Sequence, residues 1–544
     1  MYKRLFRPMT VLLATVVLLT GTLLPAFADD PQPQRWVPIG ASYEADTLQL
    51  FAAQAVDYNA DDVVQLRLLP ITYGFDAYVI TPKERAENLE LLQRRAGQLL
   101  DACEAELAAP ATSCQVTIID MQIRDDAVDL DKVALLSDDV DGVYIPGGDQ
   151  VIAIEVIRNT PAETALGDLF AAGAPIGGNS AGAAVQSYHM IAGYTGDNYP
   201  WDGLREGAVD LWYGDPDPDQ RGLAFGLQEA VVEQHVLQRG RLARLLQAVN
   251  ELPDSHIGVG LDNATAAVIE DGASVYDVTG LTAAAVVDLD SYGAAGAGYP
   301  VGILSLRAGA LHLLPPGDNS YDLDSLTPTL DGNPVAAPGL AGRNLDFVAG
   351  PDGSALFIAG DLTSDSGGPV VQDFAALASV RPGQTLVVGL GDPNGSGQSL
   401  ASNWKEPLRR AGIRRVEAVS LTPGMSQKAL DAVKRQVQQA GALMIVSDQQ
   451  EYVAELIDEL NYAGLVGRWT AGVPVLMDNG AAAAAGQWMS ANPTPTSDEL
   501  EDQGSESFLL SGSPYVVDVR AGLGMIPGVA FEPRKFPISA AYPV

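Results

Sequence analysis

A serine within a glycine-rich turn is the residue best placed to do chemistry in this chain. Ser180 lies in a G-x-S-x-G pattern with Gly178 and Gly182, between an apolar run that ends at Ile176 and a helix whose first turns are expected over residues 181–187. This strand–turn–helix pattern is that of a nucleophile elbow, where small neighbours let the strand and helix approach closely and Oγ projects into a cleft. The same pattern also fits a tight turn without a catalytic role, so its partners decide between the two.

A serine nucleophile needs a general base, which is usually a histidine. The chain has four histidines. His235 ends an apolar, strand-like run, and the end of a parallel strand faces the crevice where α/β proteins place their sites. His189 lies nine residues after Ser180 on the same expected helix, so we expect it to point away, and we expect His256 in a turn and His312 in a strand. The pattern therefore favours His235.

Four motifs in this part of the chain resemble the cyanophycinases and their relatives, the aspartyl dipeptidases. They are the turn P-G-G-D-Q, the elbow G-N-S-A-G-A, the segment Q-H-V-L-Q-R-G-R-L-A-R-L-L and the strand G-V-G-L-D-N-A-T-A. The similarity runs from about Trp36 to Leu323. It implies a serine exopeptidase on a three-layer α/β/α fold, which is flavodoxin-like and akin to class I glutamine amidotransferases.

The resemblance also implies roles for particular residues. Ser180 would be the nucleophile and His235 the base. Asp197, 17 residues after the serine in the segment Y-T-G-D-N-Y, would be the third member of the triad. Gly148 and Ala181 would offer backbone N–H groups to the oxyanion.

Further residues are expected to line the substrate pocket. Asp149 and Gln150 would lie beside the nucleophile. Arg239, Arg241 and Arg244 match basic residues that follow the base in cyanophycinases, and a guanidinium can bind a substrate carboxylate in a bidentate manner. On a helix, however, two of these three arginines would face solvent or pair with nearby acids, and Arg241 or Arg244 is the one expected in the pocket.

The resemblance implies hydrolysis of aspartyl or β-aspartyl bonds, in a peptide or in a cyanophycin-like polymer. Two alternatives stay open: an aspartyl dipeptidase acting on other peptides, and a non-catalytic binding protein. One departure from the family pattern is that Asp262 is followed by Asn263 rather than by an acid.

Two halves of the chain look like copies of one α/β unit. Strand-like and helix-like segments alternate from Trp36 onward, which is typical of a mostly parallel sheet. Gln150 precedes Ser180 by 30 residues, and Gln450 precedes Gly480 by the same number. This spacing predicts a diverged internal repeat, in which Asn479 or Gly480 replaces the serine. The second copy should therefore be catalytically inactive.

The expected domain organisation follows from these patterns. Residues 1–28 form a signal peptide, 35–323 the catalytic domain, 324–348 a linker rich in Pro, Gly and Asp, and 349–544 the degenerate and truncated repeat. We expect a monomer in which the repeat mimics a dimer, or else a homodimer.

The first 28 residues and the composition bear on where the protein acts. A basic start, the apolar run 11–24 and the sequence Ala-Phe-Ala at 26–28 predict a secretory signal peptide and a secreted or periplasmic protein in a bacterium. In such a location Cys103 and Cys114 could form a disulfide or remain two buried thiols. The net charge of −37 disfavours nucleic acid and, after signal cleavage, a membrane surface as partners. No cofactor is expected, and no His, Cys and Asp cluster has metal-ligand spacing.

Overall fold

The structure is a computed structural model, and it describes the chain from residue 32 onward with several gaps. The described ranges are 32–137, 139–195, 207–236, 238–291, 309–335, 355–360, 362, 367–491 and 519–531. The expected signal peptide at residues 1–28 lies outside them.

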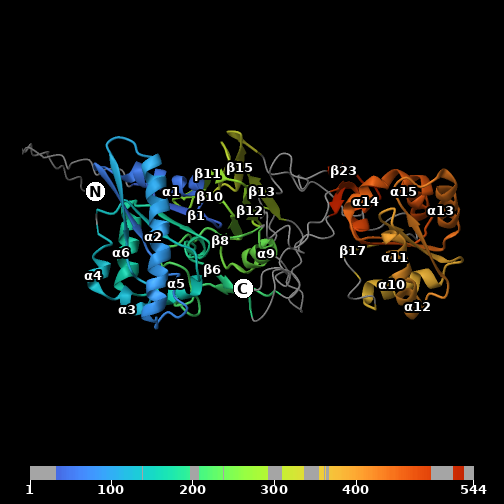
Figure 1. The fold of residues 1–544 in the computed structure, drawn as a ribbon, viewed down its shortest axis with the longest axis horizontal. Helices are drawn as coiled ribbons and strands as arrows, with labels where there is room; N and C mark the ends of the chain where they lie inside the picture. Colours follow the sequence, from blue (N-terminus) through green and yellow to red (C-terminus); the bar gives the residue numbers. More distant parts are fainter. Residues whose placement is uncertain are drawn as a thin grey trace, which may run out of the picture.

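The first unit is built on a ten-stranded sheet, and its parallel part carries the site (Figure 1). The parallel strands lie in the order β1-β5-β4-β2-β3, and β10 pairs with β1 in the antiparallel direction. Their bounds are β1 (Arg35–Ile39), β2 (Val63–Leu68), β3 (Ser113–Ile118), β4 (Gly142–Ile145), β5 (Ile176–Asn179) and β10 (Thr265–Glu270). The sheet continues beyond β10 through β11 (Ser274–Gly280), β14 (Ser320–Asp322), β15 (Thr327–Leu330) and β16 (Asn333–Pro334).

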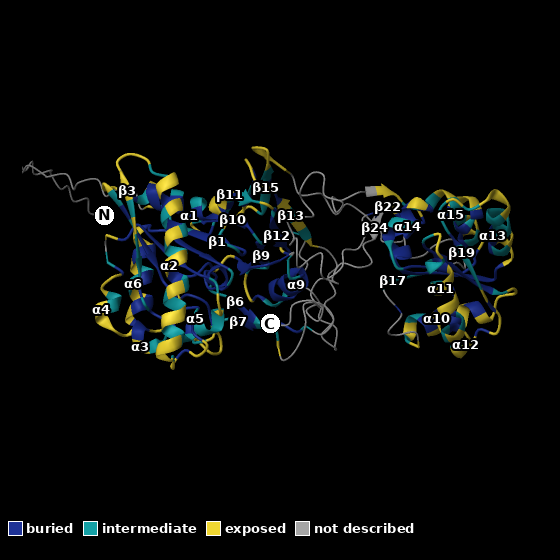
Figure 2. Cartoon of the chain, viewed as in Figure 1, coloured by how far each residue is buried: buried dark blue, intermediate teal, exposed yellow. Residues whose placement is uncertain are grey.

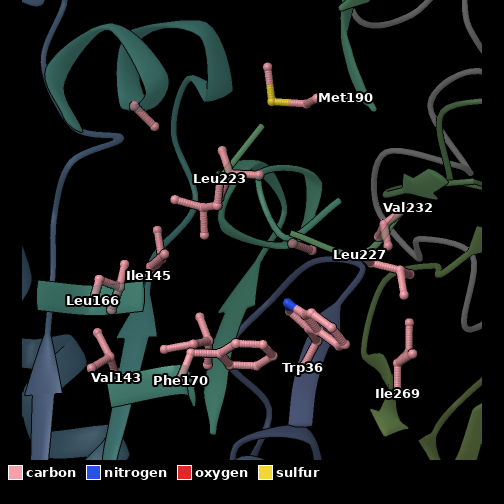
Figure 3. Packing of buried hydrophobic residues seen from close by; sticks show 14 of the residues in the cluster. Trp36, Val143, Ile145, Leu166, Phe170, Met190, Leu223, Leu227, Val232 and Ile269 are labelled. Carbon is pink, nitrogen blue, oxygen red and sulfur yellow. The ribbon is translucent and has the colours of Figure 1, made fainter. Parts of the chain in front are cut away.

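Helices cover both faces of the parallel strands, because successive side chains of a strand point to opposite faces. Val37 packs with α1 (Ala45–Tyr58) and α2 (Pro82–Ala105) on one face. Its neighbour Trp36 packs on the other face with α5 (Gln150–Ile157) and α6 (Pro161–Ala172). Figure 2 shows the buried strands between these helices, and Figure 3 shows Trp36 beside Phe170 of α6, with ring centroids 4.4 Å apart. The unit is therefore a three-layer α/β/α fold, which confirms the predicted fold class.

Local sequence signals explain where the main helices begin. Thr81 and Glu84 form a capping box at the start of α2, with Pro82 in the first turn. Thr160 caps α6, which ends at Gly173 in the left-handed conformation. Near its end α2 is joined to β3 by a disulfide between Cys103 and Cys114.

A smaller four-stranded sheet is formed by strands that follow the elbow in the chain, and His235 follows its strand β8. Its order is β13-β12-β9-β8, with α9 (Leu242–Glu251) packed against it. The strands are β8 (Val231–Glu233), β9 (Ile257–Gly260), β12 (Ala284–Asp288) and β13 (Ala310–Leu314). A two-stranded ribbon of β6 (Met190–Gly193) and β7 (Asp210–Trp212) follows the elbow in the chain.

The second unit has its own fully parallel sheet. Its order is β17-β21-β20-β18-β19. Counted along the chain within each unit, this is first-fifth-fourth-second-third, the same order as β1-β5-β4-β2-β3 in the first unit. The strands are β17 (Leu356–Ala359), β18 (Thr385–Leu390), β19 (Val416–Leu421), β20 (Ala442–Ser447) and β21 (Val475–Asn479). One face packs against α10 (Pro369–Ser379), α11 (Ser396–Asn403) and α12 (Lys405–Arg410). The other packs against α13 (Gln427–Gln439), α14 (Gln450–Glu455), α15 (Ile457–Ala463) and α16 (Leu465–Thr470). After β21 come the 3₁₀ helix η2 (Gly480–Ala485) and the strands β22 (Gly486–Ser490), β23 (Val519–Ala521) and β24 (Ile526–Phe531).

The expected linker at 324–348 is partly structured. Residues 327–334 form β15 and β16, which extend the first sheet from β14. Pro334 lies on β16, the last strand of the sheet, where proline is tolerated because fewer ladder hydrogen bonds are needed. Residues 336–348 lie outside the described residues. Among the helices that the structure describes, none is both long and apolar enough to cross a membrane.

Candidate active site

Ser180 occupies a strained turn between β5 and α7 (Ala181–Ala184). Its backbone has φ 53° and ψ −116°, a combination that residues with a side chain rarely adopt. Gly182 makes the turn possible, since a Cβ there would lie 1.9 Å from the Ile145 carbonyl oxygen. A Cβ at Gly178 would lie 2.4 Å from the same oxygen. The expected close approach of strand and helix is therefore present, and small residues are required for it.

His235 lies against this serine. Its Nε2 is 2.9 Å from Ser180 Oγ, and the imidazole follows β8 in a buried position. Burial of the ring lowers the pKa of His235 to about 2, and the charges of Arg239 and Arg241 act in the same direction. The imidazole is therefore neutral at physiological pH, which is the form that accepts a proton from serine.

The other nitrogen of His235 contacts Gln238. A hydrogen bond joins His235 Nδ1 and Gln238 Oε1, and the backbone N–H of Gln238 donates to Asp262 Oδ1 at 2.8 Å. A hydrogen bond from Nδ1–H to an oxygen acceptor leaves Nε2 free to accept from serine. Asp197, the predicted acid, lies outside the described residues. Gln238 was not foreseen, because a glutamine three residues after a histidine carries no signal by itself.

The turn before α5 holds the expected oxyanion donor Gly148 beside the elbow. Gly148 has φ 153°, and a Cβ on it would lie 2.1 Å from the Thr72 carbonyl oxygen, so only glycine fits. Thr72 Oγ1 donates to the Pro146 carbonyl at 2.9 Å, and the Gly147 N–H donates to Asn179 Oδ1 at 2.8 Å. Asn179, the residue before the nucleophile, thus ties the two turns together. This was also not foreseen.

Asp149 and Gln150, predicted to line the pocket, both stabilise the site's framework. Asp149 caps α5 by accepting from the N–H groups of Val151 and Ile152. The side-chain amide of Gln150 donates to the Ala192 carbonyl at 2.9 Å and so holds the end of β6. Their role toward a substrate stays a prediction.

The three predicted arginines have different environments. Arg244 is fully buried and bidentate to Glu233, at 2.6 and 2.8 Å. Arg241 is buried too and donates to the Gln234 carbonyl at 3.2 Å, and burial together with the charge of Arg244 lowers the pKa of Arg241 to about 9. Arg239 is half-buried. Among the three, Arg239 is the most accessible.

The remaining histidines lie outside the serine–histidine pair. His256 Nδ1 is 3.0 Å from Asp290, and His312 belongs to β13. His189 was expected on the elbow helix, but that expectation is wrong, because α7 ends at Ala184. The chain then bends toward β6. Nowhere in the described ranges do three or more His, Cys, Asp or Glu side chains group as a metal site, and the absence of a cofactor stays a prediction.

An elbow serine joined to a neutral histidine on an open parallel α/β sheet defines a serine hydrolase. The family model described as "Peptidase family S51" matches residues 110–275, which include Ser180 and His235. Residues 110–275 are therefore similar to peptidase family S51, and the predicted resemblance to the cyanophycinases is confirmed.

Two cyanophycinases and one solved structure illustrate the similarity. The cyanophycinase of Geminocystis herdmanii is 31% identical over 182 residues, which are 32% of this chain and 60% of the relative. That of Trichormus variabilis is 32% identical over 214 residues, 38% of this chain and 65% of the relative. A crystal structure of a peptidase from an acI-B1 Actinobacterium is similar over 54% of this chain and 98% of its own, at 19% identity and a TM-score of 0.36. The chain thus spans less than two thirds of the length of either cyanophycinase.

Proposed function

We propose that the protein is a serine-type exopeptidase that hydrolyses aspartyl or β-aspartyl bonds through an acyl-enzyme. The observation that carries this proposal is the 2.9 Å contact between Ser180 Oγ and His235 Nε2 at a strained elbow. A hydroxyl at that distance from a neutral imidazole can lose its proton as it attacks a carbonyl carbon.

The steps follow from the positions of the groups. Ser180 Oγ attacks the scissile carbonyl while His235 takes its proton. The N–H groups of Gly148 and Ala181 stabilise the oxyanion, since both belong to turns beside Oγ. His235 then returns the proton to the leaving amine. Water, activated by the same imidazole, hydrolyses the acyl-enzyme.

The charges around the base support a substrate that carries a carboxylate. The chain has a net charge of −37, yet Arg239, Arg241 and Arg244 all lie close enough to His235 to lower its pKa. A cluster of positive side chains in a protein of negative net charge favours the binding of a substrate that carries an anionic group. The sequence pattern favoured Arg241 or Arg244 for this contact, but both are buried in the structure. We therefore assign the carboxylate contact to Arg239, the most accessible of the three.

One observation favours a second candidate, a binding protein without activity. The Nδ1 partner of His235 in the described structure is the neutral amide of Gln238 rather than a carboxylate. A neutral partner stabilises the imidazolium of the transition state less well.

A substrate panel separates these candidates. The mature protein is incubated with cyanophycin and with α- and β-aspartyl dipeptides, and the products are identified by mass spectrometry. Ser180→Ala should abolish turnover, with a loss of roughly 10⁶-fold, while the fold and ligand binding persist. His235→Ala should be nearly as damaging, whereas His256→Ala and His312→Ala should change little. Turnover that survives in pure Ser180→Ala protein contradicts the mechanism.

We also propose that the protein is exported and that its second unit is an inactive duplicate. The disulfide between Cys103 and Cys114 supports export, since such bonds persist in oxidising compartments. The shared strand order of the two parallel sheets supports duplication. No histidine occurs after His312 in the sequence, so the second unit cannot form a serine–histidine pair. The N-terminal sequence of protein recovered from the native host tests export, and it should begin at Asp29.

A further inference from the structure

The second unit contains a turn with the backbone conformation of the nucleophile elbow. Asn479, the last residue of β21, has φ 60° and ψ −138°, close to the φ 53° and ψ −116° of Ser180. β21 takes the same place in its sheet as β5 does in the first. Asn479 is therefore held where Ser180's counterpart is expected.

The side chain of Asn479 is folded onto the next peptide group. Its Oδ1 accepts the Gly480 N–H at 2.8 Å, and the residue is only 6% exposed. Gly480 is itself required, since a Cβ there would lie 2.8 Å from the Gln449 carbonyl carbon. The fold thus holds the Asn479 carboxamide in contact with the backbone nitrogen of a residue that has no side chain to block it.

This conformation is the one needed to close a five-membered ring. Such a ring joins the Asn479 Cγ to the Gly480 nitrogen, and it closes when Cβ and that nitrogen are nearly eclipsed about the Cα–C bond. Because the backbone nitrogen and Cβ of an L residue lie about 120° apart around that bond, ring closure needs ψ of about −120°. Strands hold ψ at about +135° and helices at about −42°, so both keep the two atoms apart. At ψ −138°, Asn479 is already near the cyclic geometry.

We propose that Asn479 is a site of spontaneous succinimide formation in the folded protein. The Gly480 nitrogen attacks Asn479 Cγ, forming the N–Cγ bond. The Cγ–Nδ2 bond breaks, and the side-chain nitrogen leaves as ammonia, taking up the proton that Gly480 gives up. Water adds later to either ring carbonyl, which produces aspartate or isoaspartate. This modification is independent of the activity proposed above.

The chain supplies an internal control. Its second Asn-Gly pair is Asn394-Gly395, in an exposed turn after β18. There the Gly395 N–H donates to the Asp392 carbonyl at 3.3 Å instead of to its own asparagine side chain. The two sites have the same reacting groups and different geometries.

The test compares the two sites in folded and unfolded full-length protein. Samples are incubated at mildly alkaline pH with and without guanidinium chloride, digested at acidic pH, and mapped for peptides that have lost one ammonia or become aspartate or isoaspartate. Unfolded, the two sites should react at similar rates. Folded, Asn479 should react roughly tenfold faster than when unfolded, because the unfolded chain rarely visits the strained conformation that the fold imposes. Asn479→Gln should remove the signal at this site and leave that at Asn394 unchanged.

The same measurement can overturn the proposal. If Asn479 reacts in the folded protein at the unfolded rate or more slowly, the turn does not promote ring closure and the proposal is wrong.

Discussion

The charge of Arg239 influences the pH at which His235 can act as a base. Burial lowers the pKa of His235 most, and Arg239 is the largest of the charges that lower it further. Protonation of the base abolishes attack, so activity falls as the pH drops through this pKa. The lowered pKa places the acid limb of kcat/KM well below the pH of about 6.5 typical of an ordinary histidine.

Arg239→Gln removes a positive charge, so it should raise the pKa of His235 and move the acid limb upward. Arg239→Lys keeps the charge and should leave the limb in place, even if KM rises. The measurement is kcat/KM as a function of pH for the three proteins. A wild-type limb near pH 6.5, or the same limb in all three, contradicts the assignment.

Gln238 and Asp197 are the two candidates for the residue that orients the imidazole of His235. Gln238→Ala should lower kcat by about 10- to 100-fold if its hydrogen bond to Nδ1 orients the ring. Asp197→Asn should lower kcat by up to ~10⁴-fold if that carboxylate is the third member of the triad. Gln238→Glu is the matched variant, since a carboxylate at Nδ1 raises the pKa of His235 and should shift the acid limb upward. Full activity in both Gln238→Ala and Asp197→Asn would mean that neither residue orients the base.

At the scale of elements, the elbow depends on how closely α7 approaches β4. Gly182→Ala would place a methyl group 1.9 Å from the Ile145 carbonyl oxygen, so the turn must shift. We expect a loss of about 1–3 kcal/mol in the free energy of unfolding, together with a fall in kcat as Oγ moves from His235. Gly193→Ala is the control, because no atom lies within 4 Å of a Cβ there. Denaturant unfolding and steady-state kinetics measure both effects, and equal stabilities for the two variants contradict the close-approach account.

Local signals predicted the elements of the site better than its contacts. The elbow could be predicted because its glycines, its apolar strand and its serine are adjacent in the sequence. The length of the following helix could not, because the bend after Ala184 depends on the pairing of Ser187 with Leu227. Pairing with a nearby acid was one of the two environments expected for the arginines, but the partner of Arg244 could not be named. Glu233 lies on a neighbouring strand, and the helical pattern alone does not indicate which strand packs beside the helix.

Strands within the expected linker were missed because they are short and contain proline. β15 and β16 carry no alternating pattern long enough to indicate a strand. They are held by antiparallel pairing with β14 and with each other. The fold class, in contrast, is set by the alternation of apolar strands and amphipathic helices over each unit, which the sequence displays throughout.

At the scale of the whole molecule, each unit has apolar clusters on both faces of its own parallel sheet. Ser180, His235 and the expected oxyanion donors all belong to the first unit. A protein truncated before Ala349 should therefore keep the chemistry. A duplicated chain can form within one molecule an interface that otherwise needs two subunits. If the second unit replaces the partner of a homodimer in this way, the truncated protein should also dimerise or aggregate. Light scattering after size-exclusion chromatography and kcat/KM per active site measure both outcomes. A truncated protein that is monomeric and as stable as the full chain contradicts the pairing.

The two turns at Ser180 and Asn479 have one backbone conformation, yet only the first carries a hydroxyl and a neighbouring histidine. Selection for hydrolysis cannot be what maintains the second turn, so the shape belongs to the scaffold and catalysis makes use of it. A survey that searched structures for enzymes by unusual dihedral angles alone would retrieve both turns. Only the presence of a base within reach of the side chain distinguishes the working site from the one that merely has its shape.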